Sequence, residues 1–219
     1  NRDPGDRPWN RSSNFNTMAR NKHSITLELA TPEGRDVFRR LVEVSDLFIQ
    51  NSVPGSMERL GIDYPVLSDW NPRLSMISVS GAGQTGPWRE YRGWGYIFES
   101  LYGYCSLIGY PDMDADGVPV TVPSDASTGV TVALAAIMAL QQRERMGKGS
   151  FIDISLGETI AQTMSEHYMD YQMNQRVADR LGNRHLRRVQ GAYPSAGDDE
   201  WIAISIGTIG QWHALCRLI

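Results

Sequence analysis

Ser75-Met-Ile-Ser-Val-Ser80 is a short, largely apolar segment that runs directly into a glycine-rich stretch, Gly81-Ala-Gly-Gln-Thr-Gly-Pro87. This combination is typical of a buried strand followed by a loop. In α/β proteins the loops that follow strands are where ligands bind. The glycine-rich stretch matches neither GxGxxG nor a Walker loop, so it is a weak phosphate motif. A turn that needs glycine at positive φ is the stronger interpretation.

Strands and helices alternate on both sides of this segment. We predict further strands at 25–29, 46–50, 151–155 and 200–206. Thr31 followed by Pro32 predicts a helix start with Thr31 as N-cap. A short helix should end at Gly61, and longer helices should cover about 96–108, 127–145 and 158–175. The alternation favours an α/β layered domain with a mostly parallel sheet, and the basic segment 176–191 is predicted to be a linker.

The composition is ordinary for a soluble globular protein. The 219 residues are 41% hydrophobic and 21% charged, with a net charge of −4, which gives no reason to expect nucleic acid or an anionic membrane as a partner. The apolar run Val130–Leu140 alone is too short to span a bilayer. Cys105 and Cys216 make no disulfide framework, and the scattered histidines predict no metal site. We therefore expect a cytoplasmic protein without a metal.

The two ends of the sequence suggest a piece of a longer protein. The first residue is Asn1 rather than methionine, and the stretch after it has no apolar segment typical of a signal peptide. The last nine residues, 211–219, have a helical pattern without a stop signal after it. We therefore expect the chain to lack both ends of its protein.

Asp125 stands in Val122-Pro-Ser-Asp-Ala-Ser-Thr-Gly129, directly before the most apolar segment of the chain. Charged side chains are rarely placed so close to a buried element without a partner or a function. One interpretation is a helix N-cap, a role that Ser127 or Thr128 could share. The other is a nucleophile, because a helix start favours an ionised carboxylate. The two interpretations are compatible.

Basic residues are candidates for binding a phosphorylated ligand. Arg20, Lys22, Arg59 and Arg92 lie in predicted loops or at helix ends. Most such residues are only solvated. If several converge, they would suit phosphate oxygens, which match the fork of an arginine guanidinium.

Several segments in a fixed order resemble the class III CoA-transferase family, which includes formyl-CoA transferase, carnitine CoA-transferases and α-methylacyl-CoA racemase. The resemblance spans about residues 1–160 and is carried by the ordered set 20–25, 31–35, 50–61, 71–74, 80–87, 123–129 and 145–149. It implies a Rossmann-like large domain at 1–157 that binds CoA and lacks its beginning. A helix and linker at 158–191 and the start of a smaller α+β domain at 192–219 would follow.

The resemblance also implies an activity: transfer of coenzyme A from an acyl-CoA to a small carboxylic acid. Asp125 matches the aspartate that attacks the thioester, forming an acyl-aspartyl anhydride and then an aspartyl-CoA thioester. A carboxylate with an ordinary pKa of about 3.9 is ionised at neutral pH and needs no general base. The family forms interlocked homodimers. The implied CoA-binding residues are Arg20, Lys22, Leu27, Asn51, Arg59 and Arg92.

Departures from the family pattern narrow the activity. The racemase branch has a histidine near the start of the helix at 96, where this chain has Gly93-Trp-Gly-Tyr96, so racemisation is disfavoured. The segment 185–194 has one glycine where formyl-CoA transferase has a glycine-rich loop, so formyl or oxalyl specificity is not expected. The alternatives are a racemase, epimerase or intramolecular isomerase of the same fold, and a CoA-binding subunit in which Asp125 is only a cap.

Overall fold

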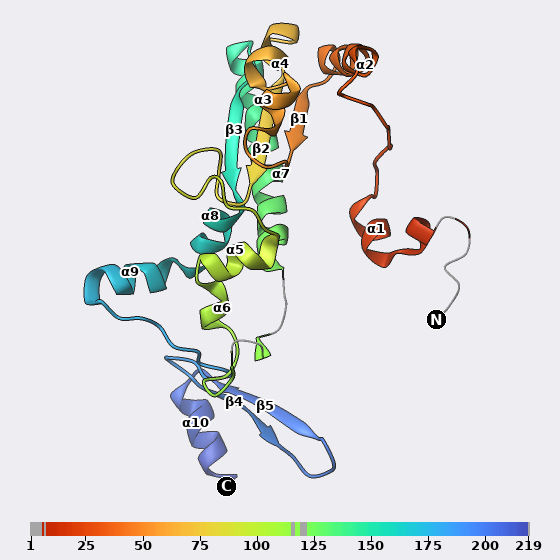
Figure 1. Cartoon of the computed structure of the whole chain (residues 1–219). Coiled ribbons are helices and arrows are strands. Elements are labelled where there is room, and N and C mark those ends of the chain that lie inside the picture. The colour runs from red at the N-terminus through yellow and green to blue at the C-terminus, as the bar shows by residue number, and fades with distance from the viewer. Residues whose placement is uncertain (1–5, 7, 115–116, 119–121, 219) are drawn as a thin grey trace. The chain divides into compact units, whose positions relative to one another are not determined.

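The computed structural model describes residues 6, 8–114, 117–118 and 122–218. The chain divides into two compact units, residues 1–41 and 42–219. Figure 1 shows the elements in chain order, coloured from red at the N-terminus to blue at the C-terminus.

The first unit is helical where it has regular structure. It contains a 3-10 turn at Pro8–Arg11, α1 at Ser13–Met18 and most of α2 at Pro32–Glu43. The Thr31 hydroxyl accepts a hydrogen bond of 3.1 Å from the Gly34 backbone N–H, which confirms Thr31 as the cap of α2. The predicted strand at 25–29 is wrong, because this segment has no regular structure. Alternation alone does not make a strand stable, and none of the described strands pairs with this segment.

A three-stranded parallel sheet organises the second unit. It consists of β1 (Leu47–Gln50), β2 (Ser75–Ser80) and β3 (Phe151–Ser155), in the order β1-β2-β3 (Figure 1). In register, Ile49 of β1 lies opposite Ile77 of β2, which lies opposite Ile152 of β3. The central strand is buried because it is paired on both edges and covered on its faces. The three strands and their parallel pairing confirm the predicted α/β fold.

Several helices connect and follow these strands: α3 (Ser56–Leu60), α4 (Tyr64–Trp70), α5 (Gly95–Leu101), α6 (Tyr104–Leu107), α7 (Pro123–Met146), α8 (Leu156–Ala161) and α9 (Ser165–Asn174). The single helices predicted at 96–108 and 158–175 are each divided. Gly103, at φ 87°, separates α5 from α6, and a 3-10 turn at Gln162–Met164 separates α8 from α9. Helix α4 was not predicted from the sequence.

A separate antiparallel pair follows α9. Strands β4 (Val189–Pro194) and β5 (Trp201–Ile206) pair with Val189 opposite Ile206, and α10 (Ile209–Cys216) follows behind a capping box of Thr208 and Gln211. The strand at 201–206 confirms the prediction. The predicted linker is wrong in its last residues, because β4 already begins at Val189. The backbone groups of β4 form hydrogen bonds with β5, and this pairing cannot be predicted from the local sequence of the segment 176–191.

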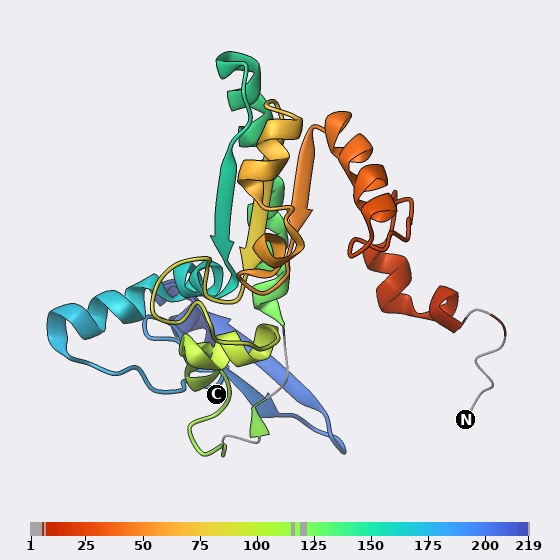
Figure 2. The same ribbon diagram turned by 45° about the horizontal axis from the view of Figure 1, so that its top comes forward.

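Helix α7 packs along the sheet against β2 and β3 (Figure 2). Near its end, the Arg143 guanidinium pairs with Asp46 at 2.6 Å, directly before β1. Because the strands run away from Asp46, the start of α7 lies toward their carboxyl ends (Figure 1). The start of the longest helix is therefore placed at the edge of the sheet where α/β proteins bind ligands.

One side of α7 carries exposed apolar residues at helical spacing, namely Val130, Leu134, Ile137 and Met138. By length and composition alone, α7 could cross a membrane, although the uninterrupted apolar run within it is shorter. Core helices of soluble proteins pass the same test, so this property is weak evidence for a membrane span.

Gly149 lies directly against the backbone at the start of β2. A Cβ at this position would lie 1.8 Å from the Leu74 carbonyl oxygen and 2.3 Å from its carbon. Gly149→Ala should lower the free energy of unfolding by about 3 kcal/mol, since strand backbone cannot move aside cheaply. Urea unfolding followed by circular dichroism measures the change. Gly129→Ala is the matched control, because nothing lies within 4 Å of its added Cβ. It should be neutral or slightly stabilising, and equal losses in both variants would contradict the prediction.

Candidate active site

Asp125 lies within the first turn of α7 rather than ahead of it. The helix begins at Pro123 with Val122 as N-cap, four residues before the predicted start. Proline is favoured at the first helical position because its φ is already helical and it has no N–H to leave unpaired. The N-cap interpretation of Asp125 is therefore wrong. Asp125 is exposed, so a solute can reach its carboxylate.

A buried glutamate holds the residue before Asp125. Glu99 of α5 is only 1% exposed, and its Oε1 accepts a 3.0 Å hydrogen bond from the Ser124 backbone N–H and a 2.6 Å bond from the Ser124 hydroxyl. Ser124 is itself fully buried. These two bonds tie the first turn of α7 to α5. Sequence reasoning missed Glu99, and the only local signal was a charged residue directly after the apolar pair Ile97 and Phe98.

The backbone of Gly95, at the start of α5, lies against the Asp125 carboxyl group. A Cβ at position 95 would lie 2.8 Å from Asp125 Oδ1 and 2.9 Å from Ser124 Oγ. Any side chain here would displace one of these groups. Gly95 therefore leaves the space that Asp125 occupies, a second contribution that the sequence did not reveal.

The glycine-rich loop after β2 supports α5 from the other side. A Cβ on Gly81 would lie 1.8 Å from the tip of the Phe98 ring, and the Gly81 carbonyl accepts a 2.9 Å hydrogen bond from the Gly157 N–H. Gly83 and Gly86 have positive φ values of 87° and 90°, which confirms the turn interpretation. The loop thus holds the residue next to Glu99 by close packing.

Helix α8 holds the next turn of α7. The hydroxyls of Thr128 and Thr159 lie 2.6 Å apart and both residues are buried. The Thr159 hydroxyl also bonds to the Leu156 carbonyl at 2.7 Å. Buried hydroxyls that are paired in this way fix the two helices in one arrangement. Asp125 is consequently an exposed group on a turn that is held on two sides.

The pKa of Asp125 is raised above its ordinary value. The larger cause is loss of solvent around the carboxyl group, and the second is the negative charge of Glu99. The helix start acts in the opposite direction, because it favours a carboxylate. The net direction differs from the expectation based on the helix start alone, since that expectation could include neither the loss of solvent around the carboxyl group nor the charge of Glu99.

This shift predicts how Asp125 affects stability with pH. An acid whose pKa is higher in the folded than in the unfolded state contributes stability that is complete below the unfolded value of 3.8 and is lost as pH rises through the folded value. Asp125→Asn should therefore be slightly more stable than the wild type at pH 7, with a free energy of unfolding higher by at most about 1 kcal/mol. Urea unfolding measures this difference. At pH 3 the difference should vanish. A variant that is less stable at pH 7 would contradict this sign.

Three of the predicted CoA-binding residues lie in the first unit. The Arg20 Nε donates to the Thr17 carbonyl at 3.2 Å, and the Lys22 ammonium donates to the Met18 carbonyl. Leu27 is half-buried in the segment before α2. These residues belong to a different unit from Asp125, and their CoA-binding role stays a prediction.

The other three lie in the second unit and are exposed. Asn51 directly follows β1, and Arg92 lies in the loop before α5. Arg59 is in α3, where its guanidinium donates to the Ser56 hydroxyl at 2.9 Å. All three are available to a ligand, and their CoA-binding role also stays a prediction.

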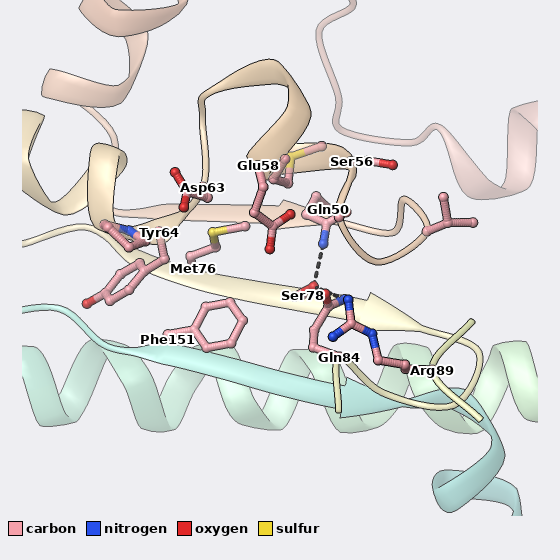
Figure 3. A pocket seen from close by; sticks show the side chains of 14 residues that line it. Gln50, Ser56, Glu58, Asp63, Tyr64, Met76, Ser78, Gln84, Arg89 and Phe151 are labelled. Carbon is pink, nitrogen blue, oxygen red and sulfur yellow. Dashed lines mark hydrogen bonds between the residues drawn. The ribbon is translucent and has the colours of Figure 1, made fainter. Parts of the chain in front are cut away.

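A cavity of about 340 Å³ opens on the side of the sheet opposite α7 (Figure 3). Met76, Tyr64 and Phe151 form its apolar part, with the two rings 5.6 Å apart. Its polar part centres on the Ser78 hydroxyl, which accepts bonds from the side-chain amides of Gln50 and Gln84. Asp125 is not among its lining residues. The cavity was not predicted, because its wall is assembled from three strands and two helices.

The cavity borders the segment that carries Asn51 and Arg59. Val53, Gly55 and Ser56 line it, and they lie between these two residues in the sequence. Across the parts of the chain that the structure describes, no group of three or more His, Cys, Asp or Glu side chains is arranged to hold a metal ion.

Comparison with known proteins gives one consistent result. The family model described as CoA-transferase family III matches residues 2–219. Succinyl-CoA--D-citramalate CoA-transferase of Chloroflexus aurantiacus is 38% identical over 189 residues, which are 85% of this chain and 46% of that protein. Succinate--glutarate CoA-transferase of Agrobacterium fabrum is 33% identical over 206 residues, 94% of this chain and 51% of that protein. The chain thus spans about half the length of these relatives.

A solved structure agrees with the fold. The CAIB/BAIF family protein from Brucella suis matches with a TM-score of 0.79 and 32% identity over 90% of this chain and 52% of that one. Because the family model covers almost every residue, the chain belongs to CoA-transferase family III.

Proposed function

We propose that this chain is part of an enzyme that moves CoA from an acyl-CoA to a carboxylic acid, with Asp125 as the nucleophile. The observation that carries this proposal is an exposed carboxylate on a turn held by buried hydrogen bonds from two other helices. Such a group can be reached by a substrate and still keep its position, as a nucleophile requires. Membership of a family whose named relatives are CoA-transferases supports the same activity.

The proposed reaction begins when an Asp125 oxygen attacks the thioester carbonyl carbon of the donor. The carbon–sulfur bond breaks, the thiolate of CoA leaves with the electron pair, and a mixed anhydride remains on Asp125. The thiolate then attacks the aspartyl carbonyl carbon of the anhydride. The donor acid leaves as a carboxylate and Asp125 becomes a thioester of CoA.

The second half of the reaction repeats these steps with the acceptor. The acceptor carboxylate attacks the Asp125 thioester, which releases the thiolate and forms a new anhydride. Attack of the thiolate on the acyl carbon of the acceptor yields the new acyl-CoA and restores the Asp125 carboxylate. No proton is gained or lost in the cycle, so an ionised nucleophile suffices without a general base.

The exposed basic and amide side chains are the proposed CoA contacts. Arg59 and Arg92 would meet phosphate oxygens, for which a guanidinium is well shaped, and Asn51 would hydrogen-bond the carrier near the end of β1. Arg20 and Lys22 would meet the adenosine phosphate end, and Leu27 is a further proposed CoA contact. We also propose that the protein works as a homodimer.

The named relatives suggest which acids to test first. One is named for succinyl-CoA and D-citramalate and another for succinate and glutarate, and all four names refer to dicarboxylic acids or their CoA thioester. We therefore propose succinyl-CoA as donor and a four- to six-carbon dicarboxylate as acceptor.

The test uses the protein with succinyl-CoA and a panel of carboxylates that includes citramalate, malate, glutarate and acetate. Mass spectrometry measures the new acyl-CoA, and hydroxylamine traps the acylated side chain for peptide mapping. We expect transfer to at least one dicarboxylate and a hydroxamate at Asp125. A protein that binds CoA but forms neither a new acyl-CoA nor an Asp125 adduct would contradict the proposal and favour the alternative of a CoA-binding subunit.

A further inference from the structure

We propose that Glu99 is a positioning residue for Asp125 and that its buried charge favours the acylated states of the enzyme. This inference deepens the proposed function and rests on it. It stands on three features of the described structure: the burial of Glu99, its two bonds to Ser124, and the close contact of the Asp125 carboxyl group with the backbone of α5.

The geometry explains how Glu99 positions the nucleophile. Both donors of Ser124, its N–H and its hydroxyl, point to the same Oε1 of Glu99. Since Ser124 directly precedes Asp125, these bonds define where the first turn of α7 lies. On the other side, Gly95 leaves the space that the Asp125 carboxyl group occupies, because a Cβ at this position would lie 2.8 Å from Asp125 Oδ1.

Positioning alone does not require a charged residue. A glutamine carbonyl could accept the same two hydrogen bonds, and burying a carboxylate is costly unless it is paired and hydrogen-bonded. Within the described residues, the ion pairs join other partners and none includes Glu99. The charge of Glu99 therefore calls for an explanation other than hydrogen bonding.

The chemistry of Asp125 supplies that explanation. The free enzyme has two neighbouring carboxylates, Glu99 and Asp125, whereas both covalent states convert Asp125 into a neutral anhydride or thioester. Repulsion between like charges raises the free energy of the free carboxylate only. The first attack, which converts the free carboxylate into the anhydride, relieves this repulsion. Glu99 therefore shifts the equilibrium from the free enzyme toward the covalent states and makes Asp125 a stronger base.

Helix α8, which packs against α7, carries the exposed residue Glu158, whose backbone N–H donates a hydrogen bond to the hydroxyl of the N-cap residue Ser155. Thr128 and Thr159 at the contact are neutral. The charge that acts on Asp125 is that of Glu99 on α5.

Glu99→Gln tests the inference, because it keeps the hydrogen-bond acceptor and removes the charge. With saturating succinyl-CoA, the ratio of Asp125 adduct to free enzyme should fall at least about twofold relative to the wild type. The pH midpoint of kcat/KM on its acid side should move to lower pH. Ser124→Ala is the matched control, since it removes one hydrogen bond and keeps the charge. It should lower the rate without moving the midpoint.

A second measurement does not depend on activity. The carboxyl carbon of Asp125, identified by NMR through its loss in Asp125→Asn, reports the pKa directly in carbon-labelled protein. Glu99→Gln should lower this pKa, and Glu99→Asp, which withdraws the charge by one methylene, should lower it less. If Glu99→Gln does not fold, the pKa measured in Glu99→Asp tests the same inference.

The outcomes separate the two proposals. A wild-type protein that forms no adduct refutes Asp125 as nucleophile, and the NMR titration then still measures the effect of Glu99. An adduct in the wild type with the same adduct ratio and the same pKa in Glu99→Gln refutes the role of the Glu99 charge.

Discussion

Asp125→Asn is expected to lower kcat/KM for CoA transfer by at least about 10³-fold, in the range seen when a covalent nucleophile is removed. Asparagine occupies nearly the same volume, but its amide oxygen carries no negative charge and does not attack a thioester at a useful rate. The hydrogen bonds from Ser124 to Glu99 do not involve the changed side chain, so the first turn of α7 should keep its place. Steady-state kinetics with succinyl-CoA and the best acceptor measure the loss.

Two controls make this result specific to the nucleophile. The affinity for CoA, measured by calorimetry, should be unchanged in Asp125→Asn. Asp69→Asn makes the same chemical change on the exposed side of α4 and should leave the kinetics as in the wild type. If Asp125→Asn retained more than a tenth of the activity, the anhydride route through this residue would have to be abandoned.

Gly95→Ala should be the next most damaging change to activity, with a loss of about 10² in kcat/KM. The added methyl carbon would lie 2.8 Å from Asp125 Oδ1 and 2.9 Å from Ser124 Oγ, both inside normal van der Waals contact. One of the two groups must therefore shift, and a nucleophile displaced by about 1 Å loses its alignment with the thioester. The kinetics should be compared with the melting temperature, because the loss is expected in folded protein.

The matched control for this substitution is Gly129→Ala. Gly129 is also helical and lies one turn beyond Asp125 on α7, but nothing lies within 4 Å of an added Cβ. Its kinetics should stay within about twofold of the wild type, as for a surface change with no new contact. Equal kinetics in the two alanine variants would show that Asp125 does not depend on the space at position 95.

Local sequence signals predicted several element boundaries well. Thr31 caps α2, Gly61 ends α3 in the left-handed region, and the three parallel strands lie within one residue of their predicted limits. These features depend on side chains and dihedral angles only a few residues apart, so the local sequence is sufficient to predict them.

Some predictions that depend on partners far apart in the sequence are wrong. The strand predicted at 25–29 does not form, and β4 begins inside the predicted linker, because a strand is stable only beside another strand. The helix around Asp125 was placed four residues too late, since Pro123 was not recognised as its first residue.

The amino-acid sequence by itself determined the α/β class, the family and the identity of Asp125 as the candidate nucleophile, because these follow from local patterns and from the order of short segments. Only the tertiary structure decided what surrounds that carboxylate. Glu99 and Gly95 precede it by 26 and 30 residues, and their contacts with the start of α7 arise because the loop after β2 seats Phe98 and α5 against it. Contacts between residues so far apart in the sequence produce no periodic pattern in it. The charge environment of Asp125 could therefore be determined only from the tertiary structure.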